Sequence, residues 1–211
     1  MLLSCGRQIL FIHIQRTGGS TIDEIVRRRV PDARRYLGTH DPASRAREAL
    51  GRDYASFFTF AFVRNPWERL VSWYATIREQ AAAVHHSRRN RLWQYVLDNS
   101  SSFDEFICHC TAVVDDVDGR KSFLYNQHDY IADEHGTIIV DFVGRYENYR
   151  TDLMKLLQRI GVSDVAVPHA NASAHRHYSA YYTPRTRDIV ADRYRRDIAA
   201  FGYSFEERRN G

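Results

Sequence analysis

A pair of glycines preceded by an arginine is the first group of residues in this sequence that could do chemistry. The segment Arg16-Thr17-Gly18-Gly19-Ser20-Thr21 directly follows an apolar run, residues 9–14. Adjacent glycines let a backbone approach an anion closely, and amide groups at the start of a helix donate hydrogen bonds to it. The positive end of the helix dipole adds favourable charge. The segment therefore predicts a cradle for phosphate or sulfate, although it lacks the first glycine and the Gly-Lys-Ser/Thr of a Walker A loop.

A second candidate anion site follows another apolar run, residues 57–63. Arg64 comes at the end of this run, and Ser72 lies on the helix that is predicted to start at Asn65-Pro66. A guanidinium group can hold a phosphate with two parallel hydrogen bonds, and a hydroxyl group can add another contact. Each motif by itself could also be a tight turn or a surface arginine. Together they favour two sites for anionic groups.

Strands that alternate with helices must position these motifs. Apolar runs at 9–14, 57–63 and 138–143 are predicted as buried strands. Apolar residues at helical spacing predict helices over 22–30, 42–50 and 148–160, with others starting at Asn65-Pro66 and at Thr183-Pro184. This alternation is typical of an α/β sandwich with a mostly parallel sheet, expected here as a single domain over residues 1–211. Ligands of such sheets bind at the carboxyl ends of the strands, where both motifs fall.

The composition agrees with a folded globular chain. Hydrophobic residues make up 44% of the 211 residues and charged residues 27%, which excludes a disordered chain. The apolar runs are far shorter than the roughly 18 residues that a membrane span needs. The net charge of +4 comes from basic residues scattered among acidic ones, so the charge alone does not indicate a nucleic-acid partner.

The cysteines and the amino-terminal residues suggest a compartment. The chain has three cysteines, at spacings that match no disulfide framework, and we interpret them as reduced thiols. Two of them, Cys108 and Cys110, are separated only by His109, whereas zinc-binding pairs usually have two to four residues between them. No second pair follows, so no metal is expected. The first ten residues contain no signal-peptide pattern. A cytoplasmic protein is therefore expected.

The two motifs resemble the paired nucleotide signature of the sulfotransferases. Segments 11–21 and 62–72 are most similar to the carbohydrate O-sulfotransferases, a branch that includes the heparan sulfate 2-O- and 6-O-enzymes and many bacterial relatives. The likeness continues through 141–147, 171–173 and 181–184, and so extends over most of the chain. The resemblance implies a P-loop-kinase-like three-layer fold. It also implies 3′-phosphoadenosine 5′-phosphosulfate (PAPS) as the sulfuryl donor, without a metal ion.

The resemblance further implies roles for individual residues. Loop 16–21 would bind the 5′-phosphosulfate, and Arg64 and Ser72 would bind the 3′-phosphate. A separate hypothesis is that Arg176 reaches the 3′-phosphate or the adenine from a C-terminal loop. Arg16 stands where the family usually has a lysine that contacts the leaving phosphate. The positive charge is kept, but a planar fork replaces a compact ammonium group. We therefore expect the transfer rate to be altered more than donor binding.

Transfer to a hydroxyl group also needs a general base, and neutral imidazole suits that role near pH 7. His40 is our candidate, because it precedes the helix that Asp41-Pro42 is predicted to cap. The helix dipole favours the neutral imidazole there, whereas Asp41 favours the charged form. Its position between the two motifs also matches that of the family's catalytic histidine. The alternative is a capping or turn role, and His13 is expected to be a strand residue beside the glycine loop.

Two other functions compete with sulfuryl transfer. Residues 138–141 resemble a Walker B strand ending in Asp141, which would indicate a nucleotide-dependent kinase, yet no Gly-Lys-Ser/Thr hydroxyl is present to bind Mg²⁺. A basic nucleic-acid-binding module is supported only by the charge, and no recognised binding motif accompanies it. For a sulfotransferase, the resemblance indicates a sugar hydroxyl as the acceptor. Residues 83–125, which would shape the acceptor pocket, contain no readable chemistry, and no pattern indicates an oligomeric state.

Overall fold

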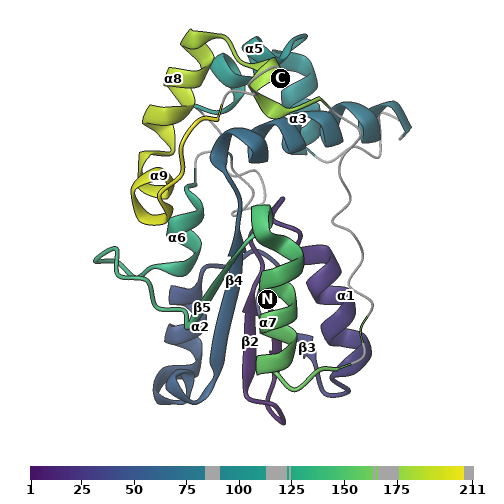
Figure 1. The fold of residues 1–211 in the computed structure, drawn as a ribbon, viewed down its shortest axis with the longest axis vertical. Helices are drawn as coiled ribbons and strands as arrows, with labels where there is room; N and C mark the ends of the chain where they lie inside the picture. Colours follow the sequence, from purple (N-terminus) through teal and green to yellow (C-terminus); the bar gives the residue numbers. More distant parts are fainter. Residues whose placement is uncertain (84–90, 113–122, 124, 164, 166–175, 207–211) are drawn as a thin grey trace. The chain divides into compact units, whose positions relative to one another are not determined.

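The computed structural model describes residues 1–83, 91–112, 123, 125–163, 165 and 176–206 (Figure 1). The chain divides into two compact units. The first, here called the sheet unit, comprises Met1–Arg64 and Gln127–Ala172. The second, here called the helical unit, comprises Asn65–Asn126 and Ser173–Gly211. The expectation of one domain over the whole chain stays a prediction.

A five-stranded sheet lies at the centre of the described part of the sheet unit, in the order β3-β1-β2-β4-β5. The strands are β1 (Leu2–Ser4), β2 (Ile9–Ile12), β3 (Arg34–Arg35), β4 (Phe58–Val63) and β5 (Phe142–Arg145). β2, β4 and β5 pair in parallel, whereas β1 is antiparallel to both of its neighbours. Four of these five strands therefore run in one direction, which confirms the α/β class and the mostly parallel sheet.

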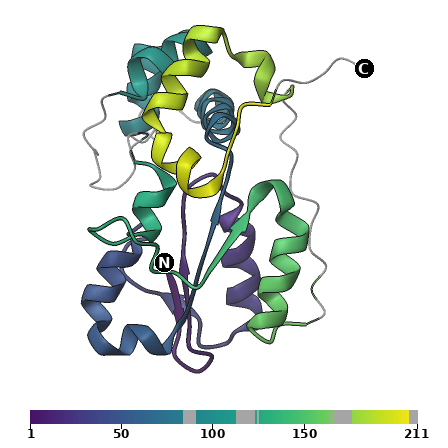
Figure 2. The same cartoon turned by 60° about the vertical axis from the view of Figure 1, so that its left-hand side comes forward.

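Helices cover both faces of this sheet, because its central strands are apolar on both sides. The helical segments are α1 (Gly19–Arg29), α2 (Ala43–Leu50), η1 (Gly51–Ser56), α6 (Gln127–Ile131), η4 (Tyr146–Asn148) and α7 (Tyr149–Arg159). Figure 2 shows α1 and α7 on one side of the sheet and α2 on the other. Alternate residues such as Phe11 and Phe60 pack against Ile22 of α1 and Leu153 of α7. These layers confirm the expected sandwich.

The start of α2 differs from the sequence prediction. The helix begins at Ala43 with Pro42 in the N-cap position, so the prediction of Asp41 as the cap was wrong. The buried Asp41 carboxylate instead accepts a hydrogen bond from the Gly38 backbone N–H at 2.9 Å. A carboxylate that points back to residue 38 closes a turn rather than capping the helix after it. This turn carries His40.

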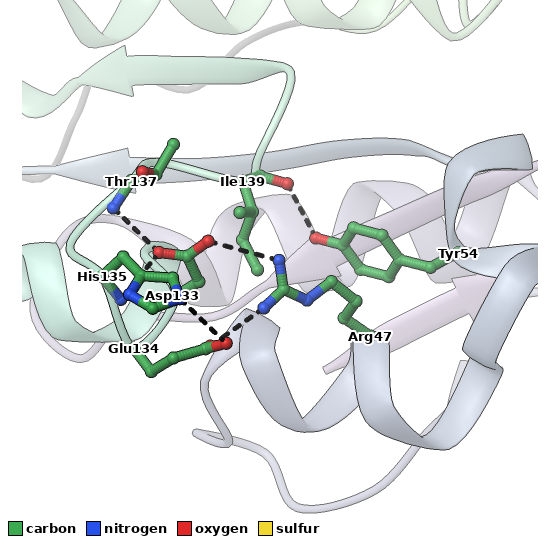
Figure 3. A network of polar contacts seen from close by, with 7 residues as sticks. All are labelled: Arg47, Tyr54, Asp133, Glu134, His135, Thr137 and Ile139. Carbon is green, nitrogen blue, oxygen red and sulfur yellow. Dashed lines mark hydrogen bonds and ion pairs between the residues drawn. The ribbon is translucent and has the colours of Figure 1, made fainter.

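Polar contacts tie α2 and η1 to the segment before β5 (Figure 3). The Arg47 guanidinium of α2 lies 3.4 Å from the Asp133 carboxylate and 3.0 Å from that of Glu134. The Tyr54 hydroxyl of η1 donates to the Ile139 carbonyl at 2.9 Å. Arg47 and Glu134 are partly exposed, so each ion pair stabilises the fold by at most about 1 kcal/mol. The contacts hold α2 and η1 against residues 133–139.

The described part of the helical unit consists of α3 (Pro66–Ala83), α4 (Arg91–Asn99), α5 (Phe103–Glu105), η3 (Phe106–Cys110), η5 (Tyr178–Tyr181), α8 (Pro184–Arg193) and α9 (Arg195–Phe201). The predicted cap of α3 is confirmed, because the Asn65 side-chain oxygen accepts the Trp67 N–H at 3.0 Å. Thr183 forms a capping box with Thr186 at the start of α8. The sequence predicted one helix that starts at Thr183-Pro184. In the structure α8 ends at Arg193, and α9 follows it from Arg195. None of the described helices is long and apolar enough to cross a lipid bilayer.

Candidate functional site

The glycine loop joins β2 to α1 at the carboxyl end of β2, as the sequence predicted. Arg16 has a φ of 65° and Gly18 a φ of 83°, so both lie in the left-handed region, which a residue with a side chain rarely adopts. The buried Thr17 hydroxyl donates to the Ile14 carbonyl at 2.9 Å and holds the turn. The first turn of α1 contains no acidic residue. Backbone amides and a nearby guanidinium group are a donor set that suits an anion.

Both glycines are also required by the side chains around the loop. A Cβ atom on Gly18 would lie 2.5 Å from the Tyr149 ring, and one on Gly19 would lie 2.2 Å from the His13 ring. Real Cβ atoms do not approach other atoms so closely. The sequence pattern indicated only the close approach of a ligand as the reason for the two glycines. The structure adds two packing partners, from the end of β2 and from α7.

Tyr149 supports the loop from α7. Its hydroxyl donates to the Gly18 carbonyl at 2.7 Å, and its ring meets that of Phe62 edge-on at 5.4 Å. Burial raises the pKa of the Tyr149 hydroxyl to about 12, so the group is a protonated donor at neutral pH. Tyr149 and Gly18 are 131 positions apart in the chain, and no local pattern in the sequence indicates that they are in contact.

Replacing Tyr149 with phenylalanine is expected to destabilise the fold by about 1 kcal/mol, because the Gly18 carbonyl loses its donor. Affinity for an anionic nucleotide should also fall, by a few-fold, since the loop is held less firmly. Urea unfolding and calorimetry measure the two effects. Tyr54→Phe is the matched control, because it removes a hydroxyl-to-carbonyl bond of the same kind away from the loop. A loss of affinity in the control as large as that in Tyr149→Phe would contradict a specific role for Tyr149.

Arg64 lies beside the glycine loop, as the pairing of the two motifs predicted. It is 3% exposed, and its Nη1 atom donates to the Arg16 carbonyl at 3.4 Å. The guanidinium carbon lies 3.9 Å from the centre of the Tyr146 ring, a cation–π contact. Gln127 binds both backbone groups of Arg64, accepting its N–H at 2.8 Å and donating to its carbonyl at 2.7 Å. Arg64 was predicted from the sequence, whereas Tyr146 and Gln127, which position it, were not.

His40 is also brought to the loop. Its Nδ1 atom lies 2.8 Å from the His13 carbonyl, and the two imidazole rings meet edge-on with their centres 4.8 Å apart. A carbonyl oxygen only accepts hydrogen bonds, so Nδ1 must be the donor. The neutral His40 ring then carries its lone pair on Nε2. That tautomer can accept a proton at Nε2.

The other predicted site residues are placed differently. Ser20 is exposed and Thr21 half-buried in the first turn of α1. Ser72 is buried on α3, and Arg176 is exposed just before η5, both in the helical unit. Their roles toward a nucleotide stay predictions. The segment 171–173 of the family resemblance lies outside the described residues.

Asp141 does not fit the Walker B interpretation. Its carboxylate accepts the Thr59 N–H at 2.7 Å and the Thr59 hydroxyl at 2.8 Å, near the amino end of β4. The strand after it starts at Phe142, not at 138 as predicted, because residues before Asp141 do not join the sheet ladder. The glycine loop lies at the carboxyl ends of the parallel strands. Asp141 is therefore at the wrong end of the sheet to reach a metal ion beside bound phosphates.

Comparisons with known proteins agree with this geometry. Residues 3–204 match the model of a family described as the sulfotransferase family. An uncharacterized protein of Archaeoglobus fulgidus is 25% identical over 142 residues, which cover 65% of this chain and 96% of that protein. The solved structure of mouse sulfotransferase SULT7A1 complexed with PAP superposes with a TM-score of 0.51 at 13% identity. The superposition covers 93% of this chain and 86% of the mouse chain, which shows a shared fold.

Proposed function

Because the chain belongs to the sulfotransferase family, we propose that it transfers the sulfuryl group of PAPS to a hydroxyl group of an acceptor, without a metal ion. The observation that carries the proposal is the meeting of Arg64, Arg16 and the start of α1 at one edge of the sheet. Two guanidinium groups and a helix start offer binding partners for the separate anionic groups of such a nucleotide. The mouse relative, of the same fold, is complexed with PAP.

Each residue of this site has a task in the proposed reaction. The backbone amides from Gly18 to Thr21 hold the oxygens of the 5′ end, and Arg16 neutralises the charge that develops on the leaving phosphate. His40 accepts the proton of the acceptor hydroxyl at Nε2 while the new sulfur–oxygen bond forms and the bond to the phosphate breaks. Arg64 binds the 3′-phosphate, the end of the nucleotide toward which the sequence also predicts roles for Ser72 and Arg176. The main work of the protein is thus positioning and charge stabilisation.

The acceptor that we propose is a saccharide or a glycosylated metabolite. This choice is supported by the similarity of segments 11–21 and 62–72 to the carbohydrate O-sulfotransferases. We also propose a cytoplasmic location, which the free thiols of Cys5, Cys108 and Cys110 support. An acceptor screen with radiolabelled PAPS would test the first of these proposals. Labelling of phenolic or amine acceptors but of no sugar would contradict it.

The purified protein is expected to bind 3′-phosphoadenosine 5′-phosphate (PAP) in preference to ATP and ADP, in EDTA and without added metal. The reason is that the site offers cations to a 3′-phosphate, whereas the described residues contain no cluster of His, Cys, Asp or Glu side chains that could hold a metal ion. Isothermal titration calorimetry with the three nucleotides measures the preference. Binding of ATP only with Mg²⁺ would support the kinase instead. A salt-sensitive shift with random DNA, without nucleotide binding, would support the nucleic-acid-binding module.

A further inference from the structure

His13 is a polar side chain in an apolar place, and the mechanism above does not use its ring. The ring stacks on Phe11 with their centres 5.3 Å apart and 21° between the planes. Its Nδ1 atom is buried, and no described residue forms a hydrogen bond with it. Burial, assisted by the charge that His40 can carry, lowers the pKa of His13 to about 3, so the ring is neutral at physiological pH. A phenylalanine at this position would pack without a buried nitrogen that lacks a hydrogen bond. The presence of a histidine therefore indicates that one of its ring nitrogens has a role.

The other edge of the ring faces the start of α1. An ideal Cβ atom on Gly19 would lie 2.4 Å from Nε2 of His13, so this nitrogen lies against the first residue of the helix. Gly19 belongs to the loop that would bind the 5′ end of the nucleotide. His13 is half-buried, not fully enclosed. Nε2 is therefore the ring nitrogen that can reach an anion bound at the start of α1.

Resting on the function proposed above, we propose that His13 binds the sulfuryl donor, its Nε2–H group donating a hydrogen bond to the anionic 5′ end of the nucleotide. A neutral imidazole carries its hydrogen on one nitrogen only. With the hydrogen on Nε2, the ring offers a donor to the anion, and the buried Nδ1 keeps a lone pair. Among backbone groups, a buried carbonyl that lacks a donor is less rare than a buried N–H group that lacks an acceptor, and the same preference applied to the ring favours a bare Nδ1. This tautomer therefore suits both edges of the ring.

The same residue would then serve both substrates. Its ring contacts the donor, while its backbone carbonyl accepts the Nδ1–H group of His40 and so orients the base. A side-chain replacement removes only the first of these contacts, because the carbonyl remains. The two roles can therefore be separated by experiment.

His13→Phe is expected to weaken PAP binding in calorimetry by about tenfold or more, the loss of one hydrogen bond to a charged acceptor. His13→Gln, whose amide N–H can replace Nε2–H, should stay within a few-fold of the unaltered protein. The affinity for adenosine 3′-phosphate, which lacks the 5′ anionic group, should be the same in all three proteins. Equal losses for both nucleotides would show a structural role only and would overturn the assignment.

A spectroscopic measurement keeps the test independent of how the variants fold. In the unaltered protein labelled with ¹⁵N-histidine, PAP should shift the Nε2–H resonance of His13 downfield, and adenosine 3′-phosphate should not. No shift, or PAP affinity unchanged by His13→Phe, overturns this inference but leaves the proposed function intact. Failure of the unaltered protein to bind PAP would overturn both.

Discussion

Replacing His40 with alanine is expected to lower the rate of sulfuryl transfer by about 10² to 10⁴-fold and to leave PAP affinity unchanged. The hydroxyl group of an acceptor is a poor nucleophile until its proton is removed, and in the proposed mechanism His40 is the residue that removes it. His40 is suited to this because the His13 carbonyl at 2.8 Å holds its hydrogen on Nδ1 and leaves the lone pair on Nε2. Single-turnover kinetics with PAPS and calorimetry with PAP separate the two effects.

The matched control for His40→Ala is His135→Ala. His135 lies on the exposed turn before β5, where its backbone N–H donates to the Asp133 side chain (Figure 3). His135→Ala also removes one imidazole, but from a turn away from the glycine loop, so the transfer rate should be unchanged. Full activity of His40→Ala would remove His40 from the mechanism and return it to the turn role considered for it. A parallel loss of PAP binding would instead indicate that the loop had been disturbed.

Much of the sheet unit could be predicted from local patterns in the sequence. The apolar runs before Arg16 and Arg64 contain the buried strands β2 and β4, because short runs that are apolar on both faces are typical of strands inside a parallel sheet. The closeness of the glycine loop and Arg64 was predicted from one rule, that parallel strands present their carboxyl ends at the same edge of the sheet. The rule holds because β2 and β4 pair in parallel, which brings the Arg64 side chain to the Arg16 carbonyl across 48 residues.

The sequence did not predict the residues that support the site from distant positions in the chain. Tyr149 and Gln127 contact Gly18 and Arg64 across 131 and 63 residues, and each contact depends on how a helix lies against the sheet. A single sequence contains no periodic signal for such a contact. Asp141 was misinterpreted for a related reason. The run 138–140 predicts a strand that ends at Asp141, but in the structure the strand begins after this residue, at Phe142, so the carboxylate lies at the amino end.

Replacing Arg64 with alanine is expected to weaken PAP binding by about tenfold or more, because a charge-assisted pair with the 3′-phosphate is lost. The effect should be large for two reasons. The residue is 3% exposed, so water screens its charge little, and Gln127 and Tyr146 hold it in place before the nucleotide binds. Arg64→Lys should also bind PAP weakly, because an ammonium group neither stacks on Tyr146 in the same way nor offers two parallel donors.

A control for Arg64→Ala must remove an arginine–aromatic contact of the same kind elsewhere in the sheet unit. Arg159 provides it, since its guanidinium carbon lies 5.2 Å from the centre of the Phe58 ring, at the amino end of β4. Arg159→Ala should leave the PAP affinity unchanged.

The assignment of Arg64 to the 3′-phosphate also predicts a loss of the preference for PAP over adenosine 5′-phosphate. A general loss of positive charge would not remove this preference. Arg64→Ala should bind PAP and adenosine 5′-phosphate with nearly equal affinity, because the 3′-phosphate then has lost its main partner. If Arg64→Ala retained the full preference for PAP, the 3′-phosphate would have to be bound by other residues.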